Sequence, residues 1–259
     1  MRSIAIMNLK GGVGKSTSTV NISAALATMG RKVCVVDIDP QAHATAHLGL
    51  QLEDNAKSIY DVLMGKCKIA EIRHQVSENL WLIPAHLDMV GAELELASVP
   101  GRELILKDEL ADDNFPADYL FIDCPPSLGL FTLNALTAVQ EVFVPIQPHY
   151  FSLHGFVRMV ETLEQVTRRL NKTLRLAGIF LSLYDGTKLA NEVSQSILEF
   201  FDQRSNLPIV CRDAKVFETK IRRNIRLAEA SGHGTPIFEY DPNSIGAEDF
   251  RNLAEEVAR

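Results

Sequence analysis

Short apolar segments alternate with longer amphipathic segments along almost the whole chain. The short segments are rich in β-branched residues, which favour extended backbone, so they predict strands. The longer segments place apolar residues at helical spacing, as at Ile22, Leu26 and Met29, so they predict helices. We expect strands at residues 3–7, 32–37, 80–84, 119–123, 141–145, 175–182 and 208–211. We expect helices at residues 15–29, 129–139, 152–170, 189–201 and 245–257.

This alternation predicts an α/β fold, with a mostly parallel, twisted sheet of about seven or eight strands and helices on both faces. Ligands of such sheets bind beyond the carboxyl ends of the strands. The chain contains no internal repeat or long linker, and we expect residues 112–116 to form a surface turn. We therefore expect residues 1–259 to fold as a single domain.

The composition is that of an ordinary globular protein, with 46% hydrophobic and 23% charged residues in 259. No stretch approaches the roughly 18 consecutive apolar residues of a membrane span, and the apolar start is too short for a signal peptide. Four cysteines are scattered without a C-x-x-C pair, so no zinc ribbon or disulfide framework is indicated. These features favour a protein of the reducing cytoplasm.

The net charge of −7 argues against a protein whose whole surface binds nucleic acid, but the charge is unevenly distributed. Residues 158–226 contain 13 of the 26 Lys and Arg residues and only 8 of the 33 Asp and Glu residues. This basic segment has a local charge of +5 and leaves −12 on the remainder. The chain therefore combines an acidic body with one basic segment.

Residues 8–17 (N-L-K-G-G-V-G-K-S-T) follow the first expected strand and open the first expected helix. The common phosphate-binding loop is G-x-x-x-x-G-K-[ST], and this segment matches its end but has Leu9 in place of the first glycine. Closely spaced glycines leave backbone N–H groups open to phosphate oxygens at a helix N-terminus. The alternative is a glycine-rich turn with no ligand, but the strand before it and the helix after it favour nucleotide binding. The predicted nucleotide-binding residues are Lys10, Gly11, Gly12, Val13, Gly14, Lys15, Ser16 and Thr17.

Two lysines in this loop have different expected roles. Lys15 is expected to contact the β- and γ-phosphates, the Ser16 hydroxyl to ligate Mg²⁺, and Thr17 to reach the α-phosphate. One lysine suffices for a nucleotide bound by the same chain. Lys10, at the lip of the loop, is therefore predicted to point toward a nucleotide bound by a partner subunit.

Three acids follow apolar strands and are expected near the phosphates. Asp123 ends one strand and is predicted to orient Mg²⁺ through water; its alternative is to cap the turn before Pro125. Asp37 and Asp39, two residues apart, leave another strand on the same side. Asp37 is suited to bind the groups that surround the metal, such as its water ligands. Asp39 is suited to position or activate the attacking water, and its alternative is a structural cap. The predicted catalytic residues are Lys10, Lys15 and Asp39, and the predicted metal-site residues are Ser16, Asp37 and Asp123.

Together these segments resemble the ParA/Soj partition family of deviant Walker-type P-loop ATPases, related to MinD. The matching motifs are K-G-G-V-G-K-S-T at 10–17, V-D-I-D-P-Q at 36–41, D-C-P-P-S-L-G at 123–129, the segment 144–155, R-N-I-R-L-A-E-A at 223–230 and Y-D-P at 240–242. The resemblance covers nearly the whole chain. It implies a magnesium-dependent ATPase of weak intrinsic activity, a homodimer that encloses ATP, and contact of Lys10 with the partner's nucleotide. It also implies non-specific DNA binding, a ParB-like partner that stimulates hydrolysis, and a role in chromosome or plasmid partition on the nucleoid.

Several departures from the family pattern affect these expectations. Ala42 and His43 stand where the family commonly has Gly-Asn, and the segment 184–188 lacks an arginine associated with DNA contact, for which Lys188 is a weaker substitute. Arg222 replaces an expected proline and adds a charge. Relatives of this length lack the N-terminal helix-turn-helix domain of longer plasmid versions. The predicted DNA contacts are Lys188, Lys215, Lys220, Arg222, Arg223 and Arg226, although basic residues on helix faces are often merely solvated. A second basic cluster consists of Arg168, Arg169, Lys172 and Arg175.

Other functions remain as alternatives. A membrane-associated MinD-like ATPase would need a basic amphipathic C-terminal helix, but the polar face of residues 245–259 is acidic, so no stable membrane association is expected. A nitrogenase-type iron protein would need cysteines at a dimer interface, which Cys124 does not provide. A ParA-like ATPase that positions another cargo would have a similar sequence. The cargo, the stimulating partner and the residues that recognise adenine are not determined by the sequence.

Overall fold

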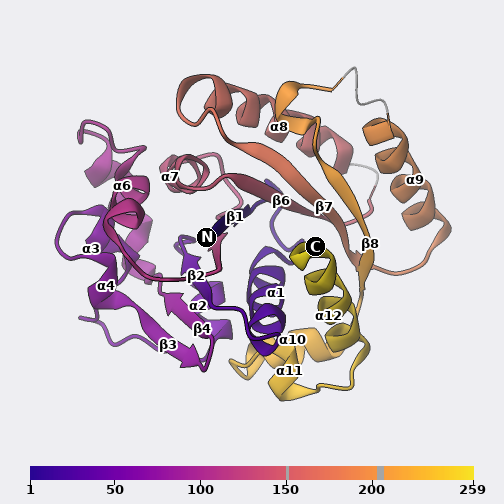
Figure 1. Ribbon diagram of the computed structural model, residues 1–259, viewed down its shortest axis with the longest axis horizontal. Coiled ribbons are helices and arrows are strands. Elements are labelled where there is room, and N and C mark those ends of the chain that lie inside the picture. The colour runs from indigo at the N-terminus through magenta and orange to yellow at the C-terminus, as the bar shows by residue number, and fades with distance from the viewer. Residues whose placement is uncertain (150–151, 203–206) are drawn as a thin grey trace.

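The computed structural model describes residues 1–149, 152–202 and 207–259. Within these residues one sheet has eight strands in the order β3-β4-β2-β5-β1-β6-β7-β8 (Figure 1). Their bounds are β1 (Arg2–Ile6), β2 (Val33–Asp37), β3 (His74–Ser77), β4 (Leu80–Ile83), β5 (Tyr119–Asp123), β6 (Glu141–Ile146), β7 (Arg175–Tyr184) and β8 (Lys215–Arg222). Neighbouring strands are parallel except β3 and β4, which form an antiparallel pair. The expected α/β fold with a mostly parallel sheet is confirmed.

The helices connect successive strands or follow the last one. Their bounds are α1 (Lys15–Thr28), α2 (His43–His47), α3 (Ile59–Leu63), α4 (Ile69–Ile72), α5 (Ala92–Leu96), α6 (Ile105–Asp112), α7 (Leu130–Ala138), α8 (Ser152–Arg169), α9 (Lys188–Asp202), α10 (Ile225–Gly232), α11 (Ile237–Tyr240) and α12 (Ile245–Ala258). Two 3₁₀ turns are η1 (Leu87–Gly91) and η3 (Ile209–Cys211). No helix in the described part of the chain combines the length and apolar character needed to cross a membrane.

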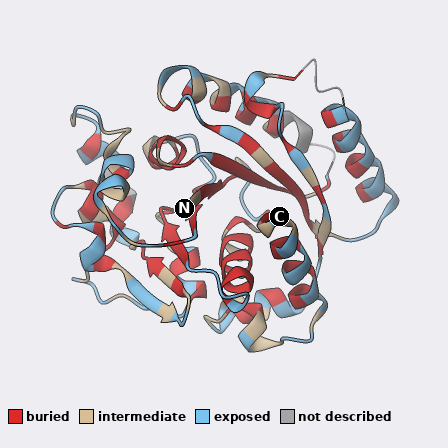
Figure 2. Cartoon of the chain, in the orientation of Figure 1, coloured by how far each residue is buried: buried red, intermediate tan, exposed pale blue. Residues whose placement is uncertain are grey.

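Side chains of successive strand residues point to opposite faces of the sheet and enter two separate cores. In β1, Ile4 and Ile6 pack in the core that contains α1 and α12, whereas Ala5 packs in the core that contains α7 and α8. Figure 1 shows these helix pairs on opposite sides of the sheet, and Figure 2 shows the central strands buried along nearly their whole length. Burial on both faces explains why these strands are continuous apolar segments and were easily predicted.

The two strands that the sequence did not predict are the two edge strands. β3 is mostly exposed and polar, and β8 carries four charged residues among its eight, so neither shows a continuous apolar segment. The strand expected at 208–211 is wrong: Ile209–Cys211 forms a 3₁₀ turn, in which the Cys211 N–H donates to the Pro208 carbonyl. The other six strands and all five helices are confirmed within a few residues at their ends. Tyr150 and Phe151, part of the family resemblance, lie outside the described residues.

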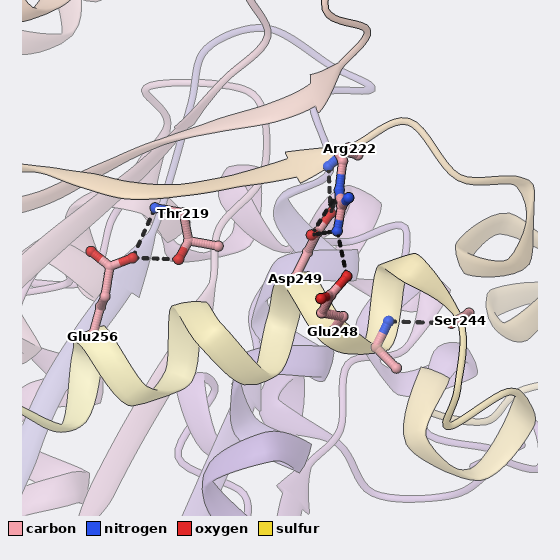
Figure 3. Close-up of polar contacts among 7 residues, drawn as sticks. Thr219, Arg222, Ser244, Glu248, Asp249 and Glu256 are labelled. Atoms are coloured by element: carbon pink, nitrogen blue, oxygen red, sulfur yellow. Dashed lines mark hydrogen bonds and ion pairs between the residues drawn. The ribbon is translucent and has the colours of Figure 1, made fainter.

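Helix α12 is joined to strand β8 by carboxylates that accept hydrogen bonds from the strand's backbone. Glu256 accepts from the N–H groups of Glu218 (2.9 Å) and Thr219 (2.8 Å), and Asp249 accepts from the N–H of Arg222 (2.8 Å). Figure 3 shows both carboxylates projecting from one helix toward the strand. The last helix therefore fixes the outer strand of the sheet through side chains as well as through apolar packing.

Candidate nucleotide-binding site

The predicted site residues converge at the carboxyl ends of the central strands. The loop of residues 8–17 leaves β1 there, and its neighbour β5 ends at Asp123. Asp37 at the end of β2 is the direct register partner of Asp123. The sheet therefore places two acids from different motifs beside the glycine-rich loop, at the edge where α/β proteins bind ligands.

The loop backbone has the conformation that its glycines allow. Gly12 and Gly14 have φ angles of 71° and 83°, in the left-handed region that residues with a Cβ atom avoid. Gly14 directly precedes α1, so the N–H groups of the first helical turn face the loop. Val13 is buried, and its carbonyl accepts a 2.8 Å hydrogen bond from the Ser182 hydroxyl of β7. This anchor fixes the loop as a cradle of backbone donors suited to phosphate oxygens.

Lys15 projects into the interior of this cradle. Its side chain is nearly buried, and Nζ donates to the Lys10 carbonyl at 3.4 Å. Burial lowers the pKa of Lys15, while the nearby charges of Asp123 and Asp39 oppose that shift. A polyphosphate would offset this cost of burial, because its oxygens favour the charged amine.

Lys10, in contrast, is exposed and directed away from the cradle. Its Nζ donates to Gln147 Oε1 at 3.0 Å, and its backbone N–H donates to Asn8 Oδ1 at 2.9 Å. The Asn8 side chain in turn donates to the Pro145 carbonyl at 2.8 Å. The two lysines of the loop therefore occupy different environments, as their different predicted roles require.

Asp123 has one carboxylate oxygen without a protein partner. Oδ1 accepts a 3.1 Å hydrogen bond from the Thr19 hydroxyl, but the buried Oδ2 accepts none of standard geometry from the described residues. Burial, followed by the charge of Asp37, raises the pKa of Asp123 well above its ordinary value, and the Ser16 hydroxyl opposes this rise. An unpartnered buried acceptor next to Ser16 fits a divalent cation or its bound water, since oxygen ligands suit Mg²⁺.

Asp37 is also buried, but both of its oxygens are satisfied by the protein. Oδ2 accepts from the Thr45 N–H and hydroxyl, each at 2.8 Å, and Oδ1 accepts from the Asp39 N–H at 3.1 Å. Burial raises the pKa of Asp37 to about 6, although these hydrogen bonds lower it. A carboxylate so fully bonded is better placed to orient metal-bound water than to ligate the metal directly.

Asp39 lies on the wall of the cleft above the loop. It is 5% exposed, and its Oδ1 accepts a 3.0 Å hydrogen bond from the Gln41 N–H. This is the hydrogen bond with which an aspartate caps a local turn. Asp39 therefore has the structural role that was its alternative in the sequence analysis. The second carboxylate oxygen, Oδ2, is the one that could bind water. The catalytic role of Asp39 stays a prediction.

A cleft of about 320 Å³ lies over the phosphate loop, a volume suited to small ligands. Its wall is formed by Gly11, Gly12, Gly14, Lys15, Ser16, Thr17, Asp39, Gln41, His43, His47, Pro126 and Ser231. A second cavity of about 330 Å³ shares Gly14, Thr17 and Ser231 with the first and extends past Leu183 and Asn224. The two cavities adjoin one another at these shared residues, and we call the space that they line between the phosphate loop, β7 and α10 the trough.

Two residues of this region have an unusual conformation or environment, and the first of them also departs from the expected family pattern. Ala42 has φ of 51°, a left-handed conformation that glycine adopts more easily. His47 is buried, and its Nε2 has no hydrogen-bond partner among the described residues. Burial lowers the pKa of His47 to about 4, while a hydrogen bond with the Thr235 backbone opposes the shift. His47 is therefore a neutral base that links α2 to the segment after α10.

Sequence reasoning missed the residues that position the predicted ones. Thr19 lies one helical turn after Lys15 on the inner face of α1, and this spacing was a usable signal. Thr45 bonds to buried Asp37 eight positions away. Asn8 bonds to the Pro145 carbonyl, and Gln147 bonds to Lys10, each across 137 positions. Such contacts carry no local sequence pattern.

The basic residues that flank β7 and β8 are divided between the two ends of the sheet. Arg175 and Lys215 are the first residues of β7 and β8, and Arg168, Arg169 and Lys172 precede β7 at the same amino end. Lys188, Arg222, Arg223 and Arg226 follow or end these strands at the carboxyl end, where the phosphate loop lies. Lys215 is thus separated from the other predicted DNA contacts by the length of a strand.

At the carboxyl end the basic side chains differ in their partners. Figure 3 shows the Arg222 guanidinium bound by two acids of α12. Nη2 lies 2.7 Å from Glu248 Oε2, and Nε donates to Asp249 Oδ1 at 2.9 Å. Arg226 pairs with Glu229 at 2.8 Å. Arg223 is exposed, and no ion pair of its side chain is found among the described residues.

Two other lysines complete this set. The Lys188 side chain is 92% exposed, with a loose 3.7 Å pair to Glu192. Lys220 Nζ lies 4.5 Å from the centre of the Tyr184 ring. Arg223 and Lys188 are therefore the cations at this end that are best placed to meet an external anion, and the DNA-binding role of the whole set stays a prediction.

Comparison with known proteins shows what the chain is similar to. A family model described as an AAA domain matches residues 1–176. The sporulation initiation inhibitor protein Soj of Bacillus subtilis is 44% identical over 257 residues, covering 98% of this chain and 97% of that protein. The chromosome-partitioning ATPase Soj of Treponema pallidum is 42% identical over 258 residues, covering 99% and 96%. Cobyrinic acid a,c-diamide synthase from Mycobacterium smegmatis, solved with an ATP analog and magnesium, has a TM-score of 0.83 and 33% identity, covering 100% of this chain and 95% of that chain.

Proposed function

The chain belongs to the ParA/Soj family of partition ATPases, and on this basis we propose that it is a magnesium-dependent ATPase that binds DNA as an ATP-bound homodimer. Its proposed task is chromosome or plasmid partition, with a ParB-like partner that stimulates hydrolysis and releases the dimer from DNA. The proposed location is the nucleoid of the cytoplasm.

For hydrolysis, the phosphate loop and the acids have distinct proposed roles. Mg-ATP supplies the phosphoryl group that is transferred to water. The loop N–H groups and Lys15 bind the phosphate oxygens and stabilise their charge, as in other P-loop proteins. Ser16 and Asp123 hold the cation, and Asp37 orients the water bound to it. Asp39 accepts a hydrogen bond from the attacking water. The adenosine is proposed to lie in the trough between Thr17 and Asn224.

The observation that carries the dimer proposal is the different placement of the two loop lysines. Lys15 is buried in the cradle of its own chain, whereas Lys10 Nζ is bonded to Gln147 outside it. An exposed amine at the lip of the cleft is available to a nucleotide on a facing subunit. In a dimer with facing clefts, Lys10 of each subunit would contact the nucleotide of the other. Because this contact needs nucleotide, it would favour the dimer only when nucleotide is bound.

The observation that supports DNA binding is the position of Arg223 and Lys188 at the same end of the sheet as the cleft. A dimer formed through the clefts would bring two such pairs together. Phosphate contacts of this kind give affinity that is independent of sequence and sensitive to salt. Membrane binding is less well supported, because Phe250, Leu253 and Val257 of α12 are buried in the core.

Binding to a duplex of arbitrary sequence in ATP and in ADP tests this function. We expect the native chain to bind only in ATP, and the Arg223→Ala/Arg226→Ala variant to lose most of that binding while keeping its nucleotide affinity. Asp39→Ala should bind ATP and accumulate dimers on DNA without turnover. No ATP-dependent binding by the native chain contradicts the proposal, and binding to anionic liposomes instead would favour the membrane alternative.

A further inference from the structure

The backbone and the side chain of Lys10 are both connected by hydrogen bonds to the carboxyl end of β6. Its N–H donates to Asn8, which is bonded to the Pro145 carbonyl in β6. Its Nζ donates to the side-chain oxygen of Gln147, just beyond the end of β6. The end of β6 therefore determines where the exposed lysine of the loop points.

The same lysine is also connected to the interior of the cradle. The Lys10 carbonyl accepts from Lys15 Nζ at 3.4 Å, a long and therefore weak hydrogen bond. Phosphate oxygens would compete for this amine, because charge-assisted hydrogen bonds are stronger than bonds to a neutral carbonyl. Nucleotide binding would then remove one of the three contacts of Lys10 and leave those on the side of β6.

Gln147 is chemically suited to a reversible contact. A neutral amide oxygen binds an exposed amine with a net gain of about 1 kcal/mol, which a facing phosphate readily exceeds. A carboxylate at the same position would form an ion pair and retain the lysine more strongly. A leucine side chain of similar size would not bind the amine at all.

We propose that Gln147 is a positioning residue for Lys10, which it holds outside its own cleft in the monomer and must release for contact with a partner's nucleotide. This inference rests on the proposed ATP-bound dimer and deepens it, by naming the contact that opposes dimerisation. Gln147 thus sets the ATP concentration at which dimers form, without contacting the nucleotide of its own chain.

Two substitutions of nearly the same size test the contact in opposite directions. In the nucleotide-free monomer, acetylation of Lys10 by an amine-reactive reagent is measured by mass spectrometry relative to exposed Lys32. We expect Gln147→Glu to slow Lys10 acetylation and Gln147→Leu to accelerate it, each about twofold or more. Equal rates in all three proteins would overturn the holding contact, whether or not dimers form.

The consequence is measured by sedimentation of the chain in ATP, with hydrolysis blocked by Asp39→Ala in every protein. We expect Gln147→Glu to weaken the dimer and Gln147→Leu to strengthen it, each about fivefold, corresponding to the exchange of one such bond. ADP affinity should be unchanged, because Gln147 lies outside the cleft lining. Gln140→Glu and Gln140→Leu, at the exposed amino end of the same strand, are the matched controls and should leave dimerisation unaltered.

The outcomes separate the two proposals. If the background protein does not dimerise in ATP, the proposed function fails, and the inference fails with it. If it dimerises but both Gln147 variants behave like the Gln140 variants, the inference alone is overturned. Opposite shifts of the two Gln147 variants, together with opposite acetylation rates, support it.

Discussion

The two ends of the sheet carry similar numbers of basic residues but use them differently. At the carboxyl end, Lys15 is buried beside the acids Asp39 and Asp123, and its pKa is shifted by that burial. At the amino end, Lys172 and Lys215 lie on the exposed surface. The same residue type is therefore part of a charged interior at one end and a solvated side chain at the other.

This difference shows that the environment of a charge decides what the charge can do. A buried cation interacts strongly with its neighbours because little water screens it, whereas exposed charges interact weakly. Among exposed cations, those that lie beside the cleft can be coupled to nucleotide binding, and those at the far end cannot be coupled directly. Each prediction below compares a residue of the carboxyl end with a matched residue elsewhere.

The largest effect is expected for Lys15→Ala. Removing the only lysine inside the cradle should weaken ATP binding by about a hundredfold or more, because charge-assisted bonds to phosphate are lost and Asp39 and Asp123 remain unopposed. Calorimetric titration with ATP measures this change. Lys32→Ala, which removes an exposed lysine, is the control and should leave affinity unchanged; equal losses in both variants would contradict the comparison.

A large effect on stability is expected for the buried base His47. Because its pKa is lowered from 6.5 to about 4, the unfolded chain takes up this proton more readily than the folded chain. The stabilising contribution is therefore complete above pH 6.5 and is lost as the pH falls toward 4, by about 3 kcal/mol. Urea unfolding of the native chain and of His47→Gln across this range measures it. The exposed His43 supplies the control variant His43→Gln, which should keep the native pH dependence.

A moderate effect is expected when one exposed cation from each end is removed. Arg223→Ala should weaken ATP-dependent DNA binding about tenfold and reduce its salt dependence, because a phosphate contact is lost. Lys172→Ala should change it less than twofold, since that residue lies at the opposite end of the sheet. Fluorescence anisotropy with labelled duplex at several salt concentrations gives both quantities. A larger effect at Lys172 would move the proposed DNA surface to the amino end.

The smallest effect is expected for Arg222→Ala and concerns stability. Arg222 is bound by Glu248 and Asp249, so its removal leaves Asp249 with fewer donors and should lower the unfolding free energy by about 1 kcal/mol. DNA affinity should fall less than for Arg223→Ala. Arg31→Ala, which removes an exposed arginine just after the end of α1, should leave stability unaltered in the same urea titration.

How much of the site was predictable depends on how far apart its contacts lie in the chain. The phosphate loop was predictable because its glycines, its lysine and its hydroxyl lie within ten consecutive residues. The glycines themselves determine the backbone conformation there. Asp37 and Asp123 were predictable because each ends an apolar strand, and parallel strands end at the same edge. Local patterns were sufficient where the local backbone forms the site.

The hydrogen bonds that position the exposed cations were not predictable from the sequence. Gln147 bonds to Lys10 across 137 positions, and Asp249 binds Arg222 across 27. The charge of Arg222 was visible in the sequence, but its partners on α12 were not. The edge strand β8 was hidden for a related reason: its charged residues interrupt the apolar pattern, although Phe217 and Ile221 are buried.

The carboxylates of α12 have a further consequence when molecules of this chain meet at high concentration. An open outer strand offers unpaired amides on which the sheet of a neighbouring molecule can extend, which leads to aggregation. Here Glu256 and Asp249 already occupy the amides of Glu218, Thr219 and Arg222. These three amides are therefore not free to pair with a strand of a neighbouring molecule, which opposes aggregation through the edge of β8.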